Sequence, residues 1–456
     1  MIRRTVSRRD FLALSGATTA GAVLAACGPA AAPAAESDDG DMPAAEGYNI
    51  VYTYPHPDTN MLGGNQRLIL ERYDSMVPGT DVQVELKTGY EMSRVQADLA
   101  AGTAPDLFWA GYTSVIQAID EGLIVNQQEY MEAAGVDFDD FVDGIEAIYA
   151  PPTVGGYFWG MPYEQVVVLF AYNVAALEES GMDPPPKDWT WDELIEWGVA
   201  VTRDVNGKRP DEDGFDPNEV DIWGVAYWQH FAIQEYLPWT AGQLYVDETR
   251  TKATINNDGV RDSLQYLRDA YASGAATEKP PEKGLVSGKV VFQEVGNWGL
   301  LDFEKQIGEG GLGALYTPSH PVHQITATPW YDKELWMPVQ DDKNREAAAY
   351  EFSEWWALGD PYLEFCLETG YFPFTKSHFA DQRWLDAIAG KEFMEIAGEM
   401  PAYATNTRFW ALFKGAQEAQ QSMYELWDLA VHTDEDLGVL MAAAEAEVQR
   451  IIDKYN

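Results

Sequence analysis

Short apolar runs with the spacing of β-strands alternate along the chain with longer segments of helical spacing. Asn49 to Tyr54 (NIVYTY), Asp81 to Leu86 (DVQVEL) and Asp106 to Gly111 (DLFWAG) are typical of strands. Val166 to Tyr172 (VVVLFAY) is apolar almost throughout, which favours a strand buried on both faces. This alternation of strands and helices predicts an α/β fold.

Local signals mark several helix boundaries. Thr190 precedes WDELIEW, and Glu193 stands three residues later, which is the capping-box pattern of a helix start. Gly102 is expected to end an earlier helix. At the C-terminus, helical spacing predicts one buried stripe made of Leu437, Leu440, Met441, Ala444, Val448, Ile451 and Ile452.

The first 47 residues carry the features of an export signal followed by a tether. Arg8 and Arg9 precede an apolar stretch that is too short for a transmembrane helix. SRRDFL resembles the twin-arginine export motif, and LAAC resembles the bacterial lipobox, in which Cys27 is lipidated. We expect a twin-arginine signal peptide over residues 1–26, then the lipidated Cys27 and a flexible tether over 27–47. The protein would then be lipid-anchored at the extracellular face of the cell membrane or in the periplasm; the alternative is an ordinary cleaved signal.

The chain is strongly acidic, with 30 basic against 74 acidic residues and a net charge of −44. Such a surface repels phosphate backbones and most anionic ligands, so nucleic acid is excluded as a partner and a neutral or cationic solute is favoured. The 456 residues are enough for two lobes with large cores. With Cys27 assigned to lipid, Cys366 has no partner for a disulfide. We expect a monomer without a cofactor.

An ordered set of motifs resembles one family along nearly all of residues 48–456. The segments are AGTAPDLFWAG, IQAIDEGLIVNQQEYM, GYFWGMPYEQVVVLFAYN, DPPPKDWTWDELIEWGVAVT, DEDGFDPNEVDIWGV, GKVVFQEVGNWG, ELWMPVQDDKNREAAAYEFSEWW and ETGYFPFTKS. In this order they resemble the extracellular solute-binding proteins of ABC importers, in the large sugar-binding family that includes maltose-binding protein.

The resemblance implies a two-lobed α/β fold of the periplasmic-binding-protein type, type II, with the ligand cleft between lobes joined by a multi-strand hinge. On that template, residues 48–163 and 325–375 form the N-terminal lobe, and residues 164–324 and 376–456 form the C-terminal lobe. The lobes would close on a carbohydrate, and a membrane permease would receive it. Because aromatic residues are 13% of the chain, we expect an oligosaccharide rather than a monosaccharide.

A sugar cleft needs aromatic faces for the apolar side of the ring and polar side chains for its hydroxyls. The resemblance places Trp109 and Tyr112, after the strand DLFWAG, at a sugar-contacting segment of the family. Tyr54, His56 and Asp58 follow the first strand in YPHPD and are expected to face the cleft, although the two prolines there also suit a simple turn.

The other candidates lie at the crossings and in the second lobe. Trp298, in GNWG, matches a family aromatic that stacks on the ligand, and its flanking glycines favour close approach. Further ligand contacts are expected from Tyr163, Glu164, Trp239, Tyr371, Phe372 and Trp410. For Trp410 the alternative is a buried helix face, because the neighbouring apolar residues share helical spacing.

A secreted carbohydrate-active enzyme is the main alternative function. Glu164 together with Asp58 or Asp106 offers a pair of carboxylates, as glycoside hydrolysis requires, but the surrounding sequence marks none of them as acid or base. The sequence contains no GxSxG elbow, P-loop or HExxH motif. We therefore expect a binding protein without catalytic residues, whose alternative solute is a polyol or an amine.

Two segments superficially suggest a metal site. His320 and His323 are separated by Pro321, which argues for a loop, and no further Cys or His completes a site. The acidic loop over residues 211–221 departs from the glycine spacing of an EF-hand. We expect no metal site from either segment.

Overall fold

The strands form one hydrogen-bonded path through the part of the chain that the structure describes. The computed structural model describes residues 47–73, 77, 82–90, 94–151, 154–227, 232–405 and 413–455. The strands are β1 (Asn49–Tyr54), β2 (Gln83–Thr88), β3 (Leu107–Ala110), β4 (Met161–Asn173), β5 (Arg203–Asp204), β6 (Val220–Ala226), β7 (Ala276–Thr277), β8 (Val290–Gly296), β9 (Leu312–Leu315), β10 (Thr328–Trp336) and β11 (Ala404–Thr405). Their order is β2-β1-β3-β10-β4-β8-β6-β5, with β11 beside β10, β7 beside β6 and β9 beside β4.

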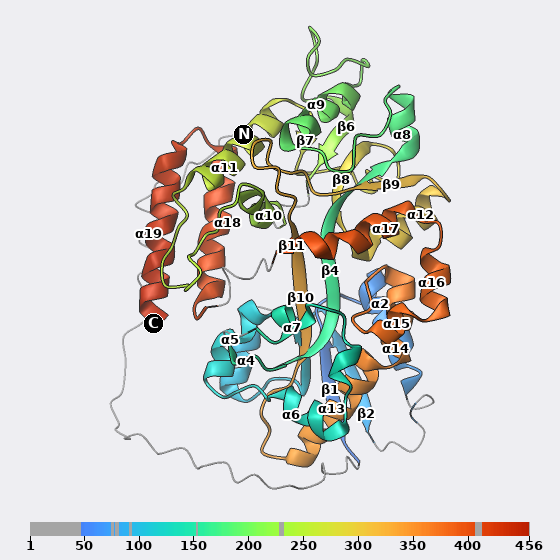
Figure 1. Ribbon diagram of the computed structural model, residues 1–456, viewed down its shortest axis with the longest axis vertical. Coiled ribbons are helices and arrows are strands. Elements are labelled where there is room, and N and C mark those ends of the chain that lie inside the picture. The colour runs from blue at the N-terminus through green and yellow to red at the C-terminus, as the bar shows by residue number, and fades with distance from the viewer. Residues whose placement is uncertain are drawn as a thin grey trace, which may run out of the picture. The chain divides into compact units, whose positions relative to one another are not determined.

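The long strand β4 changes partners in its middle. Residues 161–167 pair antiparallel with β10, whereas residues 168–173 pair with β8 and β9. Strand β10 in turn pairs with β3 at its C-terminal end. Strands β4 and β10 therefore run side by side between a first strand group (β1, β2 and β3) and a second strand group (β5 to β9), as Figure 1 shows.

Helices cover both faces of the strand groups. They are α2 (Met61–Leu70), α4 (Val95–Ala101), α5 (Tyr112–Asp120), α6 (Gln127–Ala134), α7 (Ile145–Tyr149), α8 (Val174–Glu179), α9 (Trp191–Val201), α10 (Ile233–Thr240), α11 (Asp258–Ala272), α12 (Leu300–Ile307), α13 (Lys343–Leu358), α14 (Asp360–Thr369), α15 (Lys376–Phe379), α16 (Gln382–Ile388), α17 (Glu392–Glu399), α18 (Ala416–His432) and α19 (Leu437–Tyr455). Short 3₁₀ turns are η2 (Phe138–Asp140), η4 (Asn297–Gly299) and η5 (Met400–Tyr403).

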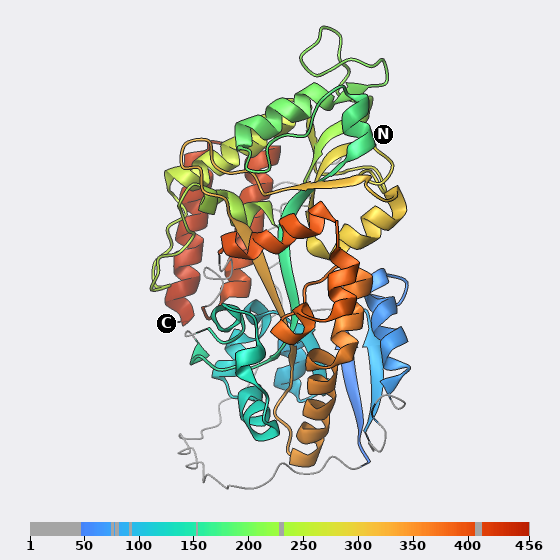
Figure 2. The ribbon, with the colours of Figure 1, turned by 45° about the vertical axis from the view of Figure 1, so that its right-hand side comes forward.

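The first strand group has a different helical layer on each face. One face packs on α2, α13 and α14, and Figure 2 shows the orange helices beside the blue strands. The other face packs on α4 and α5, where Phe108 and Trp336 are fully buried. Because side chains alternate along a strand, neighbours such as Phe108 and Trp109 face different layers.

Several local predictions are confirmed. All thirteen residues of β4 are buried, as its apolar run indicated. Helix α9 begins with the capping box of Thr190 and Glu193, and Gly102 ends α4 in the left-handed conformation at φ 66°. In α19 the buried residues are the seven of the expected stripe. Cys366 is buried and free.

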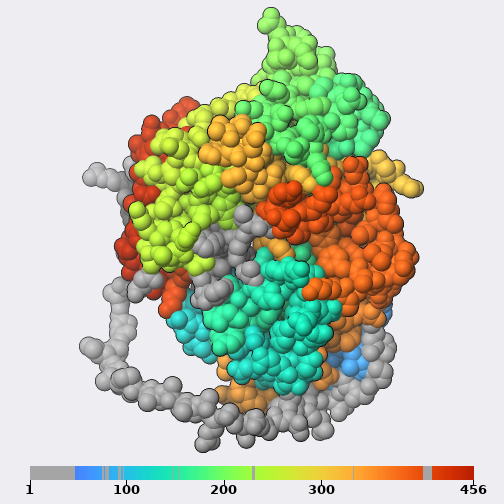
Figure 3. All heavy atoms as spheres, viewed as in Figure 1, coloured from blue at the N-terminus to red at the C-terminus, as the bar shows by residue number. Residues whose placement is uncertain are grey.

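Residues 376–388 pack against the first strand group's side of the molecule, although the expected lobe boundary lay at residue 375. The Ser377 hydroxyl donates a hydrogen bond of 2.6 Å to the Asp140 carboxylate, and the Phe372 and Trp384 ring centroids are 6.0 Å apart. Figure 3 shows this orange segment against the teal residues that precede β4. The next helix, α17, contacts β9 of the second strand group.

The expected signal peptide, Cys27 and Trp410 lie outside the described residues. In the ranges given above, no helix is both long and apolar enough to cross a membrane. Over the same ranges, no three side chains of His, Cys, Asp or Glu come together in a metal-binding arrangement.

Candidate functional site

One pocket lies over the paired strands β4 and β10 and is lined by residues from the sides of both strand groups. Its volume is about 480 Å³. The first-group side contributes the loop after β1, the start of α2, and β3, and the second-group side contributes η4 and α12. The lining residues are His56, Asn60, Met61, Leu62, Trp109, Glu164, Val166, Trp298, Gly299, Asp302, Phe303, Tyr331, Lys333 and Tyr371.

Five of the residues expected from sequence meet in this pocket, namely His56, Trp109, Glu164, Trp298 and Tyr371. Trp109 enters from β3, and Trp298 enters from η4. The Trp298 and Tyr371 rings are stacked, with centroids 6.5 Å apart and an interplanar angle of 27°. Trp298 reaches this position because its ring lies directly on Gly296, where an added Cβ would be 1.5 Å from the ring. Residue 296 therefore has to be glycine for the Trp298 ring to take this position beside Tyr371.

Glu164 is another expected residue in the pocket lining, and Tyr54, which was also expected, contacts it from outside that lining. The Tyr54 hydroxyl, fully buried, donates a hydrogen bond of 3.2 Å to Glu164 Oε1. Glu164 is only 2% exposed, and this burial raises its pKa to about 7 although nearby Lys333 and hydrogen-bond donors act in the opposite direction. Tyr54 thus supports the pocket without lining it.

Lys333 is a pocket residue that the sequence reasoning missed. Its Nζ lies 4.9 Å from the centroid of the Trp109 ring. Burial lowers the pKa of Lys333, and the carboxylates of Glu164, Glu334 and Glu235 oppose that shift. The strand pattern of TPWYDKELW contained a usable signal, since Tyr331 and Lys333 are two residues apart and therefore share a face.

Asp302 and Phe303 were also missed. They lie in the first turn of α12, one helical turn after Trp298, so the same wall continues along the helix. Asp302 Oδ2 accepts a hydrogen bond of 2.6 Å from Gln306. Helical spacing after GNWG would have been the signal for these two residues.

Two of the expected residues occupy extended positions beside pocket residues and face the other way. Tyr163, next to Glu164, is fully buried, and its ring stacks on Trp356 at 6.0 Å. Phe372, next to Tyr371, packs edge-on against Trp384. Adjacent residues in extended chain point to opposite sides, so each pair brings one member to the pocket.

Three further expected residues lie elsewhere in the described structure. Asp58 Oδ1 forms an ion pair of 2.9 Å with Arg67, and both side chains are substantially exposed. The buried Tyr112 donates a hydrogen bond of 2.7 Å to the Tyr149 carbonyl. Trp239, 8% exposed, packs into the core from α10. The pocket wall given above does not include these side chains.

The acid pairs considered for glycoside hydrolysis are not assembled across the pocket. Asp106 binds the Arg345 guanidinium through both carboxylate oxygens at 2.5 Å, away from Glu164. Asp58 is engaged with Arg67. Neither Asp58 nor Asp106 lines the pocket that contains Glu164.

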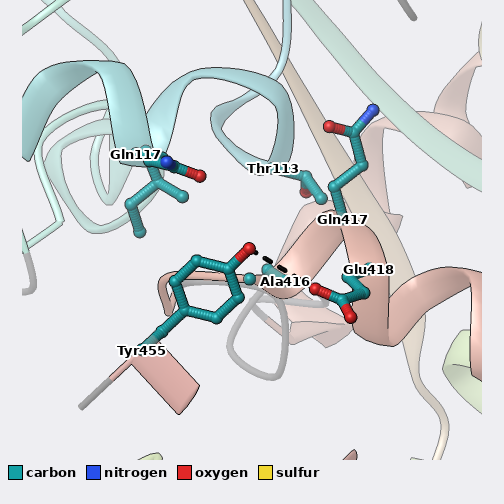
Figure 4. Close-up of a pocket in the computed structure, with 8 residues that line it drawn as sticks. Thr113, Gln117, Ala416, Gln417, Glu418 and Tyr455 are labelled. Carbon is teal, nitrogen blue, oxygen red and sulfur yellow. Dashed lines mark hydrogen bonds between the residues drawn. The ribbon is translucent and has the colours of Figure 1, made fainter. Parts of the chain in front are cut away.

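A second pocket, of about 300 Å³, lies between α5 and the helices α18 and α19. Figure 4 shows Thr113 and Gln117 on one side and Gln417, Glu418 and Tyr455 on the other. Glu418 is already held by Lys454 at 2.8 Å and Arg450 at 3.1 Å. A third pocket, beside the pair of Asp106 and Arg345, contains none of the expected aromatic residues. The aromatic pocket over β4 and β10 is therefore the candidate site.

Substituting Glu164 by Gln tests the electrostatics of the pocket. Because the pKa of Glu164 in the folded protein lies above its ordinary value of 4.5, the folded state binds this proton more tightly than the unfolded state. Its contribution to the free energy of unfolding is therefore favourable at low pH and is lost as pH rises from 4.5 through about 7. Relative to wild type, the free energy of unfolding of Glu164→Gln is therefore expected to increase by roughly 3 kcal/mol between pH 4.5 and pH 8.

Urea denaturation at both pH values measures this difference. Glu309→Gln, at an exposed position, is the control and should follow the wild-type pH dependence. Parallel pH profiles for Glu164→Gln and wild type would contradict the assignment of a buried, raised pKa to Glu164.

Comparisons with known proteins agree with this architecture. A family model described as bacterial extracellular solute-binding protein matches residues 68–391. The sn-glycerol-3-phosphate-binding periplasmic protein UgpB of Escherichia coli K12 is 20% identical over 343 residues, which are 71% of this chain and 74% of that protein.

Solved structures show the same fold at low sequence identity. The ABC substrate-binding protein Lmo0181 of Listeria monocytogenes, in complex with cycloalternan, has a TM-score of 0.71 at 18% identity, covering 89% of this chain and 99% of that one. The maltose/maltodextrin-binding domain MalE of Bdellovibrio bacteriovorus, bound to maltotriose, has a TM-score of 0.70 at 16% identity with the same coverage. UgpB of Mycobacterium tuberculosis, in complex with glycerophosphocholine, reaches 0.72 at 18% identity, again with 89% and 99% covered.

These similarities confirm the expected two-lobed α/β fold. The match to the family model covers more than two thirds of the residues. It includes β4, β10 and the pocket residues from Trp109 to Tyr371. The chain belongs to the family of bacterial extracellular solute-binding proteins.

Proposed function

We propose that this protein binds a carbohydrate in the pocket over β4 and β10 and delivers it to the permease of an ABC importer. The observation that carries the proposal is the aromatic lining of this pocket, in which Trp298 from the second-group side stacks on Tyr371 and Trp109 comes from the first strand group. Aromatic faces of this kind match the apolar side of a pyranose ring. Structural neighbours in complex with cycloalternan and maltotriose support the same solute class.

The position of the pocket supports a hinge mechanism. We propose that β4, β10 and residues 389–391 are the three crossings between lobes, which moves the third crossing from residue 375 to the segment between α16 and α17. The walls come from both sides of these crossings, so a bound solute would contact both lobes. A solute that contacts both lobes better in one hinge state stabilises that state, and the permease can distinguish it.

The proposal includes binding without catalysis. Asp58 and Asp106 support it, because each forms an ion pair with an arginine and neither faces Glu164 across the pocket. Export as a monomer anchored through a lipid on Cys27 is the arrangement that the sequence favours for the extracellular location of this family. A tethered receptor would stay near its permease.

A panel of mono- and oligosaccharides tests the proposed function by thermal unfolding and calorimetry. We expect at least one carbohydrate to stabilise the protein, by about 2.7 kcal/mol at a hundredfold excess over its Kd. The sugar should be recovered intact by mass spectrometry. Stabilisation by no carbohydrate in the panel would contradict the solute class, and turnover that depends on Glu164 would favour an enzyme.

A further inference from the structure

Lys333 brings a positive charge into an aromatic pocket. Its Nζ lies over the Trp109 ring at 4.9 Å, which is within the range of a cation–π contact. Among the described residues, the Lys333 side chain forms no hydrogen bond and no ion pair within 4.0 Å. Its ammonium therefore keeps donors for a molecule in the pocket, since an ammonium carries three N–H groups and no acceptor.

Glu164 supplies the matching negative charge without occupying those donors. Lys333 and Glu164 are register partners on β10 and β4, so their side chains share the face that lines the pocket. Glu164 accepts its hydrogen bond from Tyr54 at 3.2 Å and stays at the base of the site. The other acidic and basic side chains of the pocket are Asp302, bonded to Gln306, and His56, whose pKa is lowered by burial and by Lys333.

Without Lys333 the same walls would suit a cationic solute. Trp298, Tyr371 and Phe303 would surround the space beside Trp109, with the Glu164 carboxylate at its base. Aromatic faces around a carboxylate are the usual surroundings of a bound ammonium group. In this protein, however, the Lys333 ammonium already takes that position on Trp109.

We propose that Lys333 is a tethered cation that fills the ammonium position of the pocket, so that the site selects neutral, oxygen-rich solutes and excludes amines. The inference rests on the proposed function and narrows its solute class. A carbohydrate offers hydroxyl and ring oxygens to the free donors of Lys333. A cationic solute would meet a fixed like charge at short range and would find the Trp109 face already covered.

Removing the charge of Lys333 tests this selectivity. We expect Lys333→Met and Lys333→Gln to bind the carbohydrate identified in the panel at least tenfold more weakly than wild type. Both variants should gain calorimetrically detectable binding of choline, and wild type should show none. Lys279→Met, at an exposed lysine outside the pocket, should match wild type for both ligands. Circular dichroism and thermal unfolding establish that each variant is folded.

Choline gives the deciding result. Choline binding by either folded variant but not by wild type supports the inference. Wild-type binding of choline, or no choline binding by both folded variants, overturns it. These outcomes do not depend on whether wild type binds a carbohydrate, so a failure of the proposed function in the sugar panel is distinguished from a failure of the role given to Lys333.

Discussion

Replacing Trp298 by Ala is expected to weaken carbohydrate binding by more than tenfold while the fold stays intact. The ring is stacked against Tyr371 and forms the second-group wall of the pocket, so its loss removes apolar contact with the sugar face. Calorimetric titration with the best solute of the panel measures the effect. Unchanged affinity in the folded variant would show that the solute does not rest on this wall.

Gly296→Ala tests the same wall without deleting the aromatic ring. A Cβ at residue 296 would stand 1.5 Å from Trp298, so the ring must leave its present position. We expect an affinity loss comparable to that of Trp298→Ala. Gly398→Ala, in α17 with open space around the added Cβ, is the matched control and should bind as wild type does.

Asn297→Ala is expected to lower the free energy of unfolding by about 3 kcal/mol. Asn297 is fully buried at the point where β4 changes partners. Its Oδ1 accepts the Val167 N–H at 3.1 Å, and its Nδ2 donates to the Gln165 and Gly370 carbonyls at 3.2 and 3.1 Å. Alanine would leave these buried backbone groups without partners, which is costly because water cannot replace the amide.

Urea denaturation of Asn297→Ala at constant pH measures that loss. Asn344→Ala, at an exposed position in the first turn of α13, is the control and should change stability by less than about 0.5 kcal/mol. A loss below about 1 kcal/mol for Asn297→Ala would mean that the strand switch does not depend on the amide. The neighbouring Val168 has its own support, since Thr328 Oγ1 accepts the Val168 N–H at 2.9 Å.

Elements with strong local signals were predictable from sequence. The capping box of α9 and the buried stripe of α19 depend on residues within a few turns of one another. The apolar run in β4 likewise identified a buried strand. Such features depend on local hydrogen bonding and periodicity, which the order of residues contains directly.

The candidate site was predictable in part. Trp109, Glu164, Trp298 and Tyr371 were named from motifs and meet in one pocket. For the neighbours Tyr163 and Phe372, motif position could not tell which member of each adjacent pair faces the pocket. That choice depends on strand register, which the pairing of β4 with β10 decides. Trp410 remains a prediction.

The sequence by itself determined the class of the protein, because the alternation of strand and helix patterns and the ordered motifs are properties of the residue order. Only the tertiary structure decided the electrostatics of the pocket. Lys333 and Glu164 are far apart in sequence and become register partners because β10 returns beside β4. The Trp109 ring that faces Lys333 comes from a third strand. Charge and burial at such a site are set by the packing of distant segments, and this packing places an ammonium where sequence reasoning expected only aromatic and acidic groups.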